Sequence, residues 1–318
     1  MCRFLITVGE GRPRGPLAQC DREVACRPRR RSARRWRIEF VDHLLEGDGE
    51  GGFVQVGVSL HELDDLGLTD RTIVMYTADH GELAGAHGLR GKGPFAYEEG
   101  IHLPFYAVHP DVKGGQDCRA LTGHIDITPT LLALAGIDAT KRTEIAGRDL
   151  PGKDLSTLFT GPGAADLHAV RDGVLFTYSG LATNDSGIFR IAAEAKAAGK
   201  KPALAVIKQG YIPDMKKRGS LRTVFDGRYK FTRYFSPLDR NRPTNIDELF
   251  KWNDVELFDL STDPDEMTNL ALDRANNHDL ILSMSTELEA LIKAEIGVDD
   301  GRELPQIPRV TWTIDRVS

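Results

Sequence analysis

The chain has 318 residues, of which 41% are hydrophobic and 28% are charged, with a formal net charge of −6. This composition excludes a globally disordered chain and indicates a soluble protein with one large core, or with one core and a smaller satellite domain. No stretch approaches the roughly 20 apolar residues of a membrane-spanning helix, so we expect no membrane partner.

Residues 1–37 form an arginine-rich head with eleven arginines, no lysine and three acidic residues. Such a composition is typical of transit peptides and of nucleic-acid-binding arms. Prolines interrupt the head, and it lacks interleaved aromatic residues and an amphipathic period. We therefore expect a disordered segment and no nucleic-acid partner. The acidic, glycine-rich residues 46–52 predict a flexible linker, so residues 1–52 form an irregular head and linker.

Three of the four cysteines lie in the head, and Cys118 stands alone in the rest of the chain. The sequence therefore predicts no disulfide framework for the folded part. Arg34 and Arg35 are not followed by the apolar run of a secretory or twin-arginine signal. We expect the chain as written to be cytoplasmic, with a full-length parent in the cytoplasm or the periplasm. The oligomeric state stays open.

Residues 53–170 alternate helix and strand patterns, as expected of an α/β domain. The apolar, β-branched run Thr72–Thr77 predicts a strand that is covered on both faces within a parallel sheet. The other elements expected here are a helix over Phe53–Leu66 ended by Gly67, a buried strand over Leu103–Val108, and a helix over Ile127–Leu134 with Pro129 in its first turn and Gly136 at its end.

Residues 171–318 have the pattern of a smaller subdomain. Its expected strands are Val174–Tyr178, Arg222–Asp226, Tyr229–Phe235 and Val255–Leu260, with a tight hairpin at Asp226-Gly227. A helix over Asp279–Ile296 places five apolar side chains on one face, namely Ile281, Met284, Leu288, Leu291 and Ile292. That face is suited to packing on an antiparallel sheet. Residues 180–220 are an excursion of unassigned structure.

Polar residues gather directly after the strand pattern that ends at Thr77. Asp79 and His80 offer a carboxylate oxygen and an imidazole nitrogen to one divalent cation, because ligands bind where strands of open α/β sheets end. Lys92, between two glycines, offers a point charge to an oxyanion, and His87 precedes it. Taken singly, each of these residues also has an ordinary interpretation as a cap, a solvated turn or a loop residue.

The order of these residues along one segment resembles a known family. The runs Gly67–Glu82, Gly91–Gly93 and Tyr97–Phe105 are similar to the second conserved block of the type I sulfatases, in the alkaline-phosphatase-like superfamily. Later runs match the same family in order, namely His124–Leu132, Asp226–Phe231, Glu256–Leu260 and Asp263–Leu270. The similarity covers residues 53–296.

The resemblance implies an α/β fold with a partial alkaline-phosphatase-like sheet sandwiched by helices and a small C-terminal antiparallel subdomain. It also implies hydrolysis of a small-molecule sulfate ester. Asp79 and His80 would be metal ligands to a calcium ion (Ca2+) that polarises the ester. Lys92 would be catalytic because it offsets charge on a sulfate oxygen. His87 would contact the sulfate or the leaving group.

Two features of the family have no counterpart in this sequence: a first pair of aspartate metal ligands, and a Cys-x-Pro-Ser-Arg motif whose cysteine becomes formylglycine. Residues Cys26–Arg30 match that motif only in part, and Asp64 and Asp65 lie in an expected helix, not at the end of a strand. The composition also changes abruptly across residues 37–53. We therefore expect an N-terminally truncated or frame-disrupted sulfatase that binds calcium weakly and is inactive or impaired.

Two alternatives stay open. A phosphodiesterase or phosphonate monoester hydrolase of the same superfamily uses a similar Asp-His block, and a repaired full-length protein would then cleave aryl phosphodiesters faster than aryl sulfates. A non-catalytic remnant that binds anions near Lys92 would instead be soluble, monomeric and able to bind sulfate.

Overall fold

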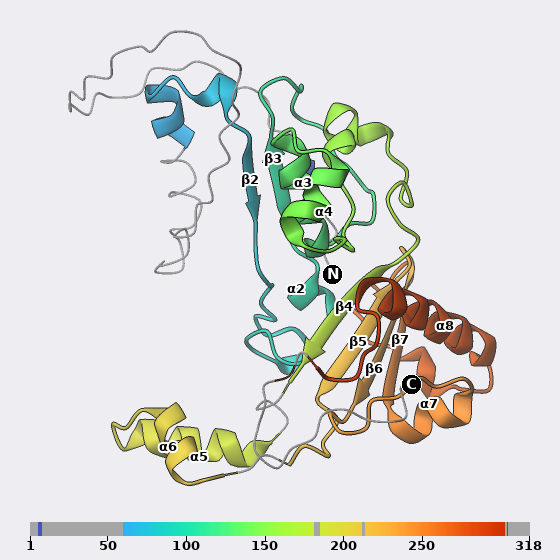
Figure 1. Ribbon diagram of the computed structural model, residues 1–318. Helices are drawn as coiled ribbons and strands as arrows, with labels where there is room; N and C mark the ends of the chain where they lie inside the picture. The colour runs from blue at the N-terminus through green and yellow to red at the C-terminus, as the bar shows by residue number, and fades with distance from the viewer. Residues whose placement is uncertain (1–5, 8–59, 181–184, 212–213, 303, 305–318) are drawn as a thin grey trace.

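The computed structural model describes residues 6–7, 60–180, 185–211, 214–302 and 304 (Figure 1). These residues build two β-sheets, each accompanied by helices, toward opposite ends of the molecule. The arginine-rich head apart from Ile6–Thr7, the linker at 46–52 and the expected start of a helix at Phe53 lie outside the described residues.

The first sheet has three strands in the order β1 (Ile6–Thr7), β3 (Phe105–Val108) and β2 (Val74–Thr77). β1 is parallel to β3, whereas β2 is antiparallel to it. The expected strand is thus present, but its expected setting is wrong: β2 is antiparallel to its neighbour and only half-buried along its length. An apolar run indicates burial and carries no information on the direction of the neighbouring strand.

β3 supplies the core beneath the first sheet. Phe105 and Ala107 are buried whereas Tyr106 is exposed, as expected of a strand with one covered face. The buried residues around them include Leu103, Cys118, Leu155, Leu158 and Phe159. β1, which belongs to the arginine-rich head, is an element that the sequence did not lead us to expect.

The helices next to this sheet are residues 60–65, α2 (Glu98–Ile101), α3 (Ile127–Leu134) and α4 (Ala139–Ala146), with 3-10 turns η1 (Thr69–Arg71), η2 (Ala86–Gly88), η3 (His124–Asp126), η4 (Ser156–Thr160) and η5 (Pro162–Ala164). α3 confirms the expected helix, with Pro129 in its first turn. Gly67 and Gly136 have φ of 62° and 79°, the left-handed conformation that ends helices.

The second sheet is antiparallel throughout, in the order β4 (Val174–Ser179), β5 (Ser220–Phe225), β6 (Tyr229–Phe235) and β7 (Asp254–Asp259). All four strands were expected. The hairpin between β5 and β6 turns at Asp226-Gly227. Gly227 has φ of 104°, a backbone conformation that residues with a side chain rarely adopt.

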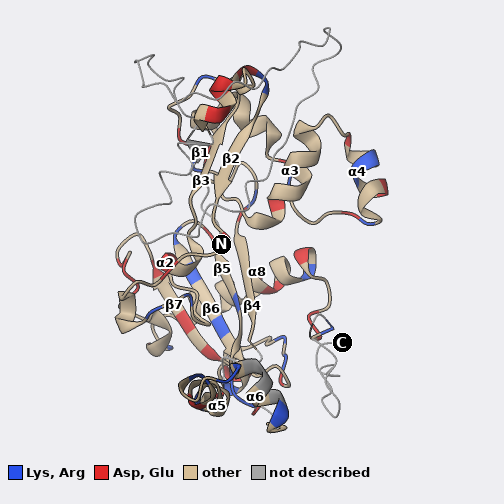
Figure 2. Cartoon of the chain, turned by 90° about the vertical axis from the view of Figure 1, so that its left-hand side faces the viewer, with Lys and Arg blue, Asp and Glu red and all other residues tan. Residues whose placement is uncertain are grey.

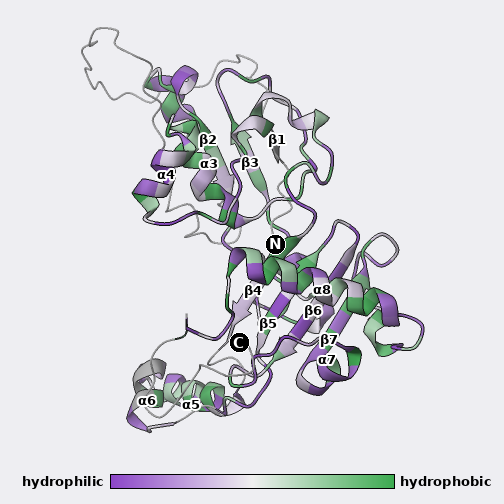
Figure 3. Cartoon of the chain, turned by 45° about the vertical axis from the view of Figure 1, so that its right-hand side comes forward, coloured by the Kyte–Doolittle hydropathy of each residue, from purple (hydrophilic) through white to green (hydrophobic). Residues whose placement is uncertain are grey.

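α8 (His278–Glu295) packs across the second sheet and confirms the expected amphipathic helix. Hydrophobic and hydrophilic residues alternate along it (Figure 3). Its buried residues Ile281, Met284, Leu288 and Ile292 join Val224, Phe231 and Leu257 in one core. Leu291 is partly buried against the same core.

The remaining elements are α5 (Ser186–Ala197), α6 (Pro202–Lys208), α7 (Ile246–Trp252) and η6 (Leu270–Leu272). α5 and α6 pack on each other and project away from both sheets (Figure 1), so the excursion between residues 180 and 220 is largely a helical pair. Every helix within the described residues is too short or too polar to cross a membrane.

Candidate active site

Asp79 and His80 lie directly after β2 and face each other. The Asp79 Oδ2 atom is 3.5 Å from His80 Nε2, and Asp79 Oδ1 accepts a hydrogen bond of 2.9 Å from the His80 backbone N–H. His80 Nδ1 lies 2.8 Å from the carbonyl oxygen of Gly81, which leaves Nε2 on the side of the carboxylate. The two side chains are 83% and 40% exposed, so they can reach a ligand from solvent.

Gly81 fixes this turn against α2. Its N–H donates to the carbonyl oxygen of Gly100 at 2.9 Å. A Cβ atom at position 81 would lie 1.8 Å from the carbonyl oxygen of Glu99. Only glycine fits here, because real Cβ atoms do not approach a backbone oxygen so closely. The turn that carries Asp79 and His80 is therefore packed directly on the backbone of α2.

Lys92 lies on a loop that folds back toward the same turn. The Glu82 carboxylate accepts hydrogen bonds from the N–H groups of Ala84 and Gly91, at 3.2 and 2.5 Å. The Leu83 N–H also donates to the Gly91 carbonyl oxygen, at 3.1 Å. These bonds close a loop that begins at Glu82, two residues after His80. They bring the backbone of Lys92 beside the turn and leave its side chain exposed.

His87 adopts a left-handed conformation, with φ of 51°, and its ring stacks on Tyr97 at a centroid distance of 3.7 Å. Its Nε2 atom is 4.0 Å from a carboxylate oxygen of Glu99. The Tyr97 hydroxyl donates to Glu256 at 3.3 Å. Burial, together with the charge of Glu256, raises the pKa of Tyr97 to about 12. The phenol is therefore neutral and available as a donor across the physiological range.

A buried ionic cluster underlies α2. Lys230 of β6 lies 3.2 Å from a carboxylate oxygen of Glu98 and also pairs with Glu266, and the Lys230 and Glu266 side chains are each 1% exposed. His102 lies 3.0 Å from the other oxygen of Glu98. Burial opposes ionisation of Glu98, but the hydrogen bond from His102 and the charge of Lys230 lower its pKa to about 2. Burial raises the pKa of Glu266 to about 7 against the charge of Lys230.

Neither Lys230 nor Glu266 was expected at the site, although both lie in runs that resemble the family, Asp226–Phe231 and Asp263–Leu270. Lys230 alternates with apolar residues in Tyr229–Phe235, which predicts a solvent-facing position. The structure instead buries it, where an unpaired charge would be costly. A lysine in such a position requires a buried acidic partner from elsewhere in the chain. The strand pattern does not identify that partner. Figure 2 shows basic and acidic stretches within the strands of the second sheet.

His124 contacts the residue that precedes the Asp79–His80 turn. Its Nε2 atom is 2.9 Å from the carbonyl oxygen of Ala78, the residue before Asp79. Burial lowers the pKa of His124, which favours the neutral imidazole. Asp126 anchors η3, because its carboxylate accepts from the N–H groups of Gly123 and Lys153 at 2.8 and 2.7 Å. The end of β2 is thus held by η3 as well as by α2.

The donor atoms of Asp79 and His80 lie close enough together to be two ligands of one divalent cation. A separation of 3.5 Å between their donor atoms suits neighbouring ligands of one ion at distances of about 2.3–2.6 Å. Calcium normally takes six to eight, mainly oxygen, ligands. Within the described residues, the one group of three or more potential metal ligands is His87, Glu99 and Glu266, which does not include this pair.

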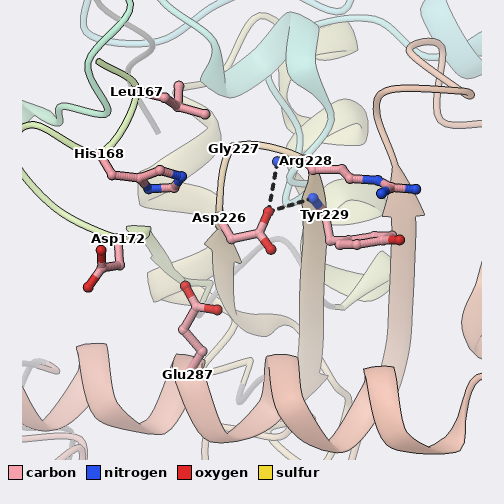
Figure 4. A pocket seen from close by; sticks show the side chains of 8 residues that line it. All are labelled: Leu167, His168, Asp172, Asp226, Gly227, Arg228, Tyr229 and Glu287. Carbon is pink, nitrogen blue, oxygen red and sulfur yellow. Dashed lines mark hydrogen bonds between the residues drawn. The ribbon is translucent and has the colours of Figure 1, made fainter. Parts of the chain in front are cut away.

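A cavity of about 400 Å³ lies elsewhere, beside the β5–β6 hairpin (Figure 4). None of the four expected site residues lines it. Asp226 accepts hydrogen bonds from the N–H groups of Arg228 and Tyr229, which shapes the hairpin. Glu287 points from α8 toward this turn. Burial, together with the charges of Asp226 and Asp172, raises the pKa of Glu287 to about 7.

Residues 55–137, which contain all four expected site residues, match the family model described as Sulfatase. An ulvan-active sulfatase from Formosa agariphila is 34% identical over 133 residues, which cover 40% of this chain and 24% of that protein. Arylsulfatase A from Bos taurus is 34% identical over 160 residues, which cover 48% of this chain and 28% of that protein. The chain therefore spans about a quarter of the length of these relatives.

Solved structures share the fold over more of the chain. A protein in complex with its substrate D-glucosamine-2-N,6-O-disulfate superposes with a TM-score of 0.55 and 19% identity, covering 80% of this chain and 40% of that one. The phosphonate monoester hydrolase SpPMH from Silicibacter pomeroyi gives a TM-score of 0.51 and 21% identity, covering 79% and 40%. These likenesses confirm the fold class expected from the sequence.

Proposed function

We propose that the chain, whose residues 55–137 match the Sulfatase family model, is a sulfatase of the alkaline-phosphatase-like superfamily and carries part of the active site of a calcium-assisted sulfuric ester hydrolase. The observation that supports this proposal best is the turn after β2. There the donor atoms of Asp79 and His80 lie 3.5 Å apart, and the loop of Lys92 closes back on Glu82 beside them.

The proposed roles follow from the chemistry of each side chain. Asp79 and His80 would hold the calcium ion, which when bound would polarise a sulfate ester. Lys92 is exposed at the surface, where it would bind a sulfate oxygen and offset charge that develops in the transition state. His87, fixed by its stack on Tyr97, would contact the sulfate or the leaving group.

The 318-residue chain is proposed to turn over sulfate esters little or not at all. The sequence has no Cys-x-Pro-Ser-Arg motif to supply formylglycine, and the first aspartate pair of the family has no counterpart. With two ligands from Asp79 and His80, calcium should bind weakly, with a Kd on the order of millimolar.

Calorimetric titration of the chain with calcium, and an assay with 4-nitrophenyl sulfate, test these statements. We expect Asp79→Ala to weaken calcium binding at least about tenfold, equivalent to about 1.4 kcal/mol. Asp70→Ala, which removes an exposed carboxylate on η1, should leave binding unchanged. Equal affinity in wild type and Asp79→Ala would disprove the metal role, and strong calcium-dependent turnover would disprove the proposed inactivity.

A phosphonate monoester or phosphodiester hydrolase is the second candidate, because SpPMH shares the fold at similar coverage. Sulfate and phosphate esters present similar tetrahedral oxygen groups, so an aspartate, a histidine and a lysine can serve either substrate. Comparing aryl sulfate with aryl phosphodiester turnover in a repaired full-length protein decides between them. Faster diester cleavage would favour this candidate.

A further inference from the structure

We propose that Glu266 is a positioning residue, which reaches from the second sheet to hold the start of α2 and thereby fixes both the Asp79–His80 turn and the His87 ring. Its role rests on the proposed function, because the site that it positions is the one assigned above.

Glu266 is built into a tight turn after β7. The Asp263 carboxylate accepts hydrogen bonds from the N–H groups of Met267 and Thr268, at 3.1 and 2.7 Å. Glu266 itself has φ of 53°, and a left-handed conformation at a residue with a side chain costs about 1 kcal/mol. This conformation directs a side chain that is 1% exposed toward Lys230 and α2.

The Glu266 carboxylate caps α2. Its Oε2 atom accepts the N–H of Glu98, the first residue of the helix, at 2.7 Å. α2 is a single turn of four residues, too short to persist through its own hydrogen bonds. This cap and the ion pairs of Lys230 with Glu98 and Glu266 therefore anchor α2 to the second sheet.

α2 in turn carries the candidate site. Gly81 packs against the carbonyl oxygen of Glu99 and donates a hydrogen bond to the carbonyl oxygen of Gly100. The Glu99 side chain lies 4.0 Å from His87 Nε2, and the ligand atoms of His87, Glu99 and Glu266 all lie within 4.8 Å of one another. A displacement of Glu266 is therefore expected to shift both the metal-binding turn and the His87 ring. α2 lies between the two sheets (Figure 1).

Two substitutions separate positioning from charge. Glu266→Gln keeps an oxygen that can accept the Glu98 N–H and removes the charge. Glu266→Asp keeps the charge, but its side chain is one methylene shorter and cannot reach Glu98. Asp265→Asn is the matched control, because Asp265 is the exposed neighbour of Glu266. The readouts are amide hydrogen exchange at Glu98, Gly81 and Val224, and the ring resonances of His87, all measured on the full chain without calcium.

We expect Glu266→Asp to accelerate exchange at Glu98 and Gly81 at least about tenfold while Val224, in β5, keeps its protection. The ring resonances of His87 should also shift, because the ring would leave its stack on Tyr97. In Glu266→Gln, the amide of Gly81 should exchange at a rate within about threefold of that in wild type. Unchanged Gly81 exchange in Glu266→Asp, or equal acceleration at Val224, would overturn the positioning role. Either outcome leaves the proposed function standing, since that function is tested by calcium binding at Asp79.

Discussion

Gly81 is the residue with the least spatial freedom in the candidate site. The missing side chain allows the turn after β2 to rest on the backbone of α2, where the Glu99 carbonyl oxygen occupies the position that a Cβ atom would need. The neighbouring backbone cannot yield without moving α2, which is tied to β6 through Glu98 and Lys230.

Gly81→Ala is expected to destabilise the chain by about 3 kcal/mol or more, because the added methyl group must displace backbone, not a flexible side chain. Urea denaturation measures the change. Gly100→Ala is the matched control: its Cβ would meet the Lys92 carbonyl oxygen at an ordinary 3.8 Å. Alanine is also favoured over glycine within a helix. Equal losses in the two variants would show that the close approach at Gly81 is unimportant.

The raised pKa of Glu287 predicts that the stability of the chain depends on pH. This pKa is raised from 4.5 to about 7, first by burial and then by Asp226 and Asp172. Between these values the folded chain keeps a proton that the unfolded chain has already released. The contribution of Glu287 to stability is therefore present below pH 4.5 and is lost as the pH rises through 7.

Glu287→Gln should remove this loss. At pH 8 the free energy of unfolding of the variant is expected to exceed that of wild type by about 2 kcal/mol, and the difference should shrink toward pH 4. Chemical denaturation at several pH values measures it. Glu144→Gln, on exposed α4, should follow the wild-type profile. A constant difference between Glu287→Gln and wild type would rule out titration of Glu287 as the cause.

At the scale of elements, α8 packs on the second sheet through apolar side chains on one face of the helix. Leu288 is completely buried at its centre, whereas Leu272 on η6 is 82% exposed. We expect Leu288→Ala to cost about 2–5 kcal/mol through lost burial and the cavity that remains, and Leu272→Ala to cost less than about 0.5 kcal/mol. Thermal or urea unfolding checks both values. A small loss for Leu288→Ala would mean that the core collapses around the gap.

Elements with a regular apolar period could be predicted from the sequence. The 3.6-residue spacing from Ile281 to Ile292 specified both α8 and its buried face, and Asp226-Gly227 specified the hairpin. The pairing of β2 could not be predicted, because its apolar residues are compatible with either direction of β3. Strand existence is a local property, whereas strand partnership depends on distant residues.

The candidate site shows the same division. Asp79, His80, His87 and Lys92 belong to one continuous segment, so a motif could find them. The groups that hold that segment come from residues more than a hundred positions away, chiefly Lys230 and Glu266. Their spacing follows no period, and only the folded chain brings them to α2. Asp79, His80, His87 and Lys92 remain predictions as functional residues.

At the scale of the whole molecule, Arg171 connects η3, beside the first sheet, with α8, which packs on the second sheet. It pairs with Asp126, which anchors η3 beside the first sheet, and lies 3.1 Å from Glu295 at the end of α8. The Asp126 side chain is fully buried. Burial raises its pKa, against the charge of Arg171, so loss of the arginine would leave an uncompensated acid.

Arg171→Met is expected to destabilise the chain by about 3–5 kcal/mol, and the double variant with Asp126→Asn should recover part of the loss. Urea denaturation of the single and double variants measures the coupling. Arg190→Met breaks an exposed pair with Glu194 on α5 and should cost less than about 0.5 kcal/mol. Additive losses at Arg171 and Asp126 would show that the two side chains do not act together.

Because the Lys230 side chain is only 1% exposed, its chemical labelling can report when the structure around it opens. Amine-reactive reagents modify lysines in proportion to their access to solvent, so Lys92 should label promptly in the native chain. Lys230, sealed between β6 and α2, should acquire the label only when those elements part. The mass increment on the peptide that contains Lys230 would therefore time each opening of the molecule, without any dye or engineered tag.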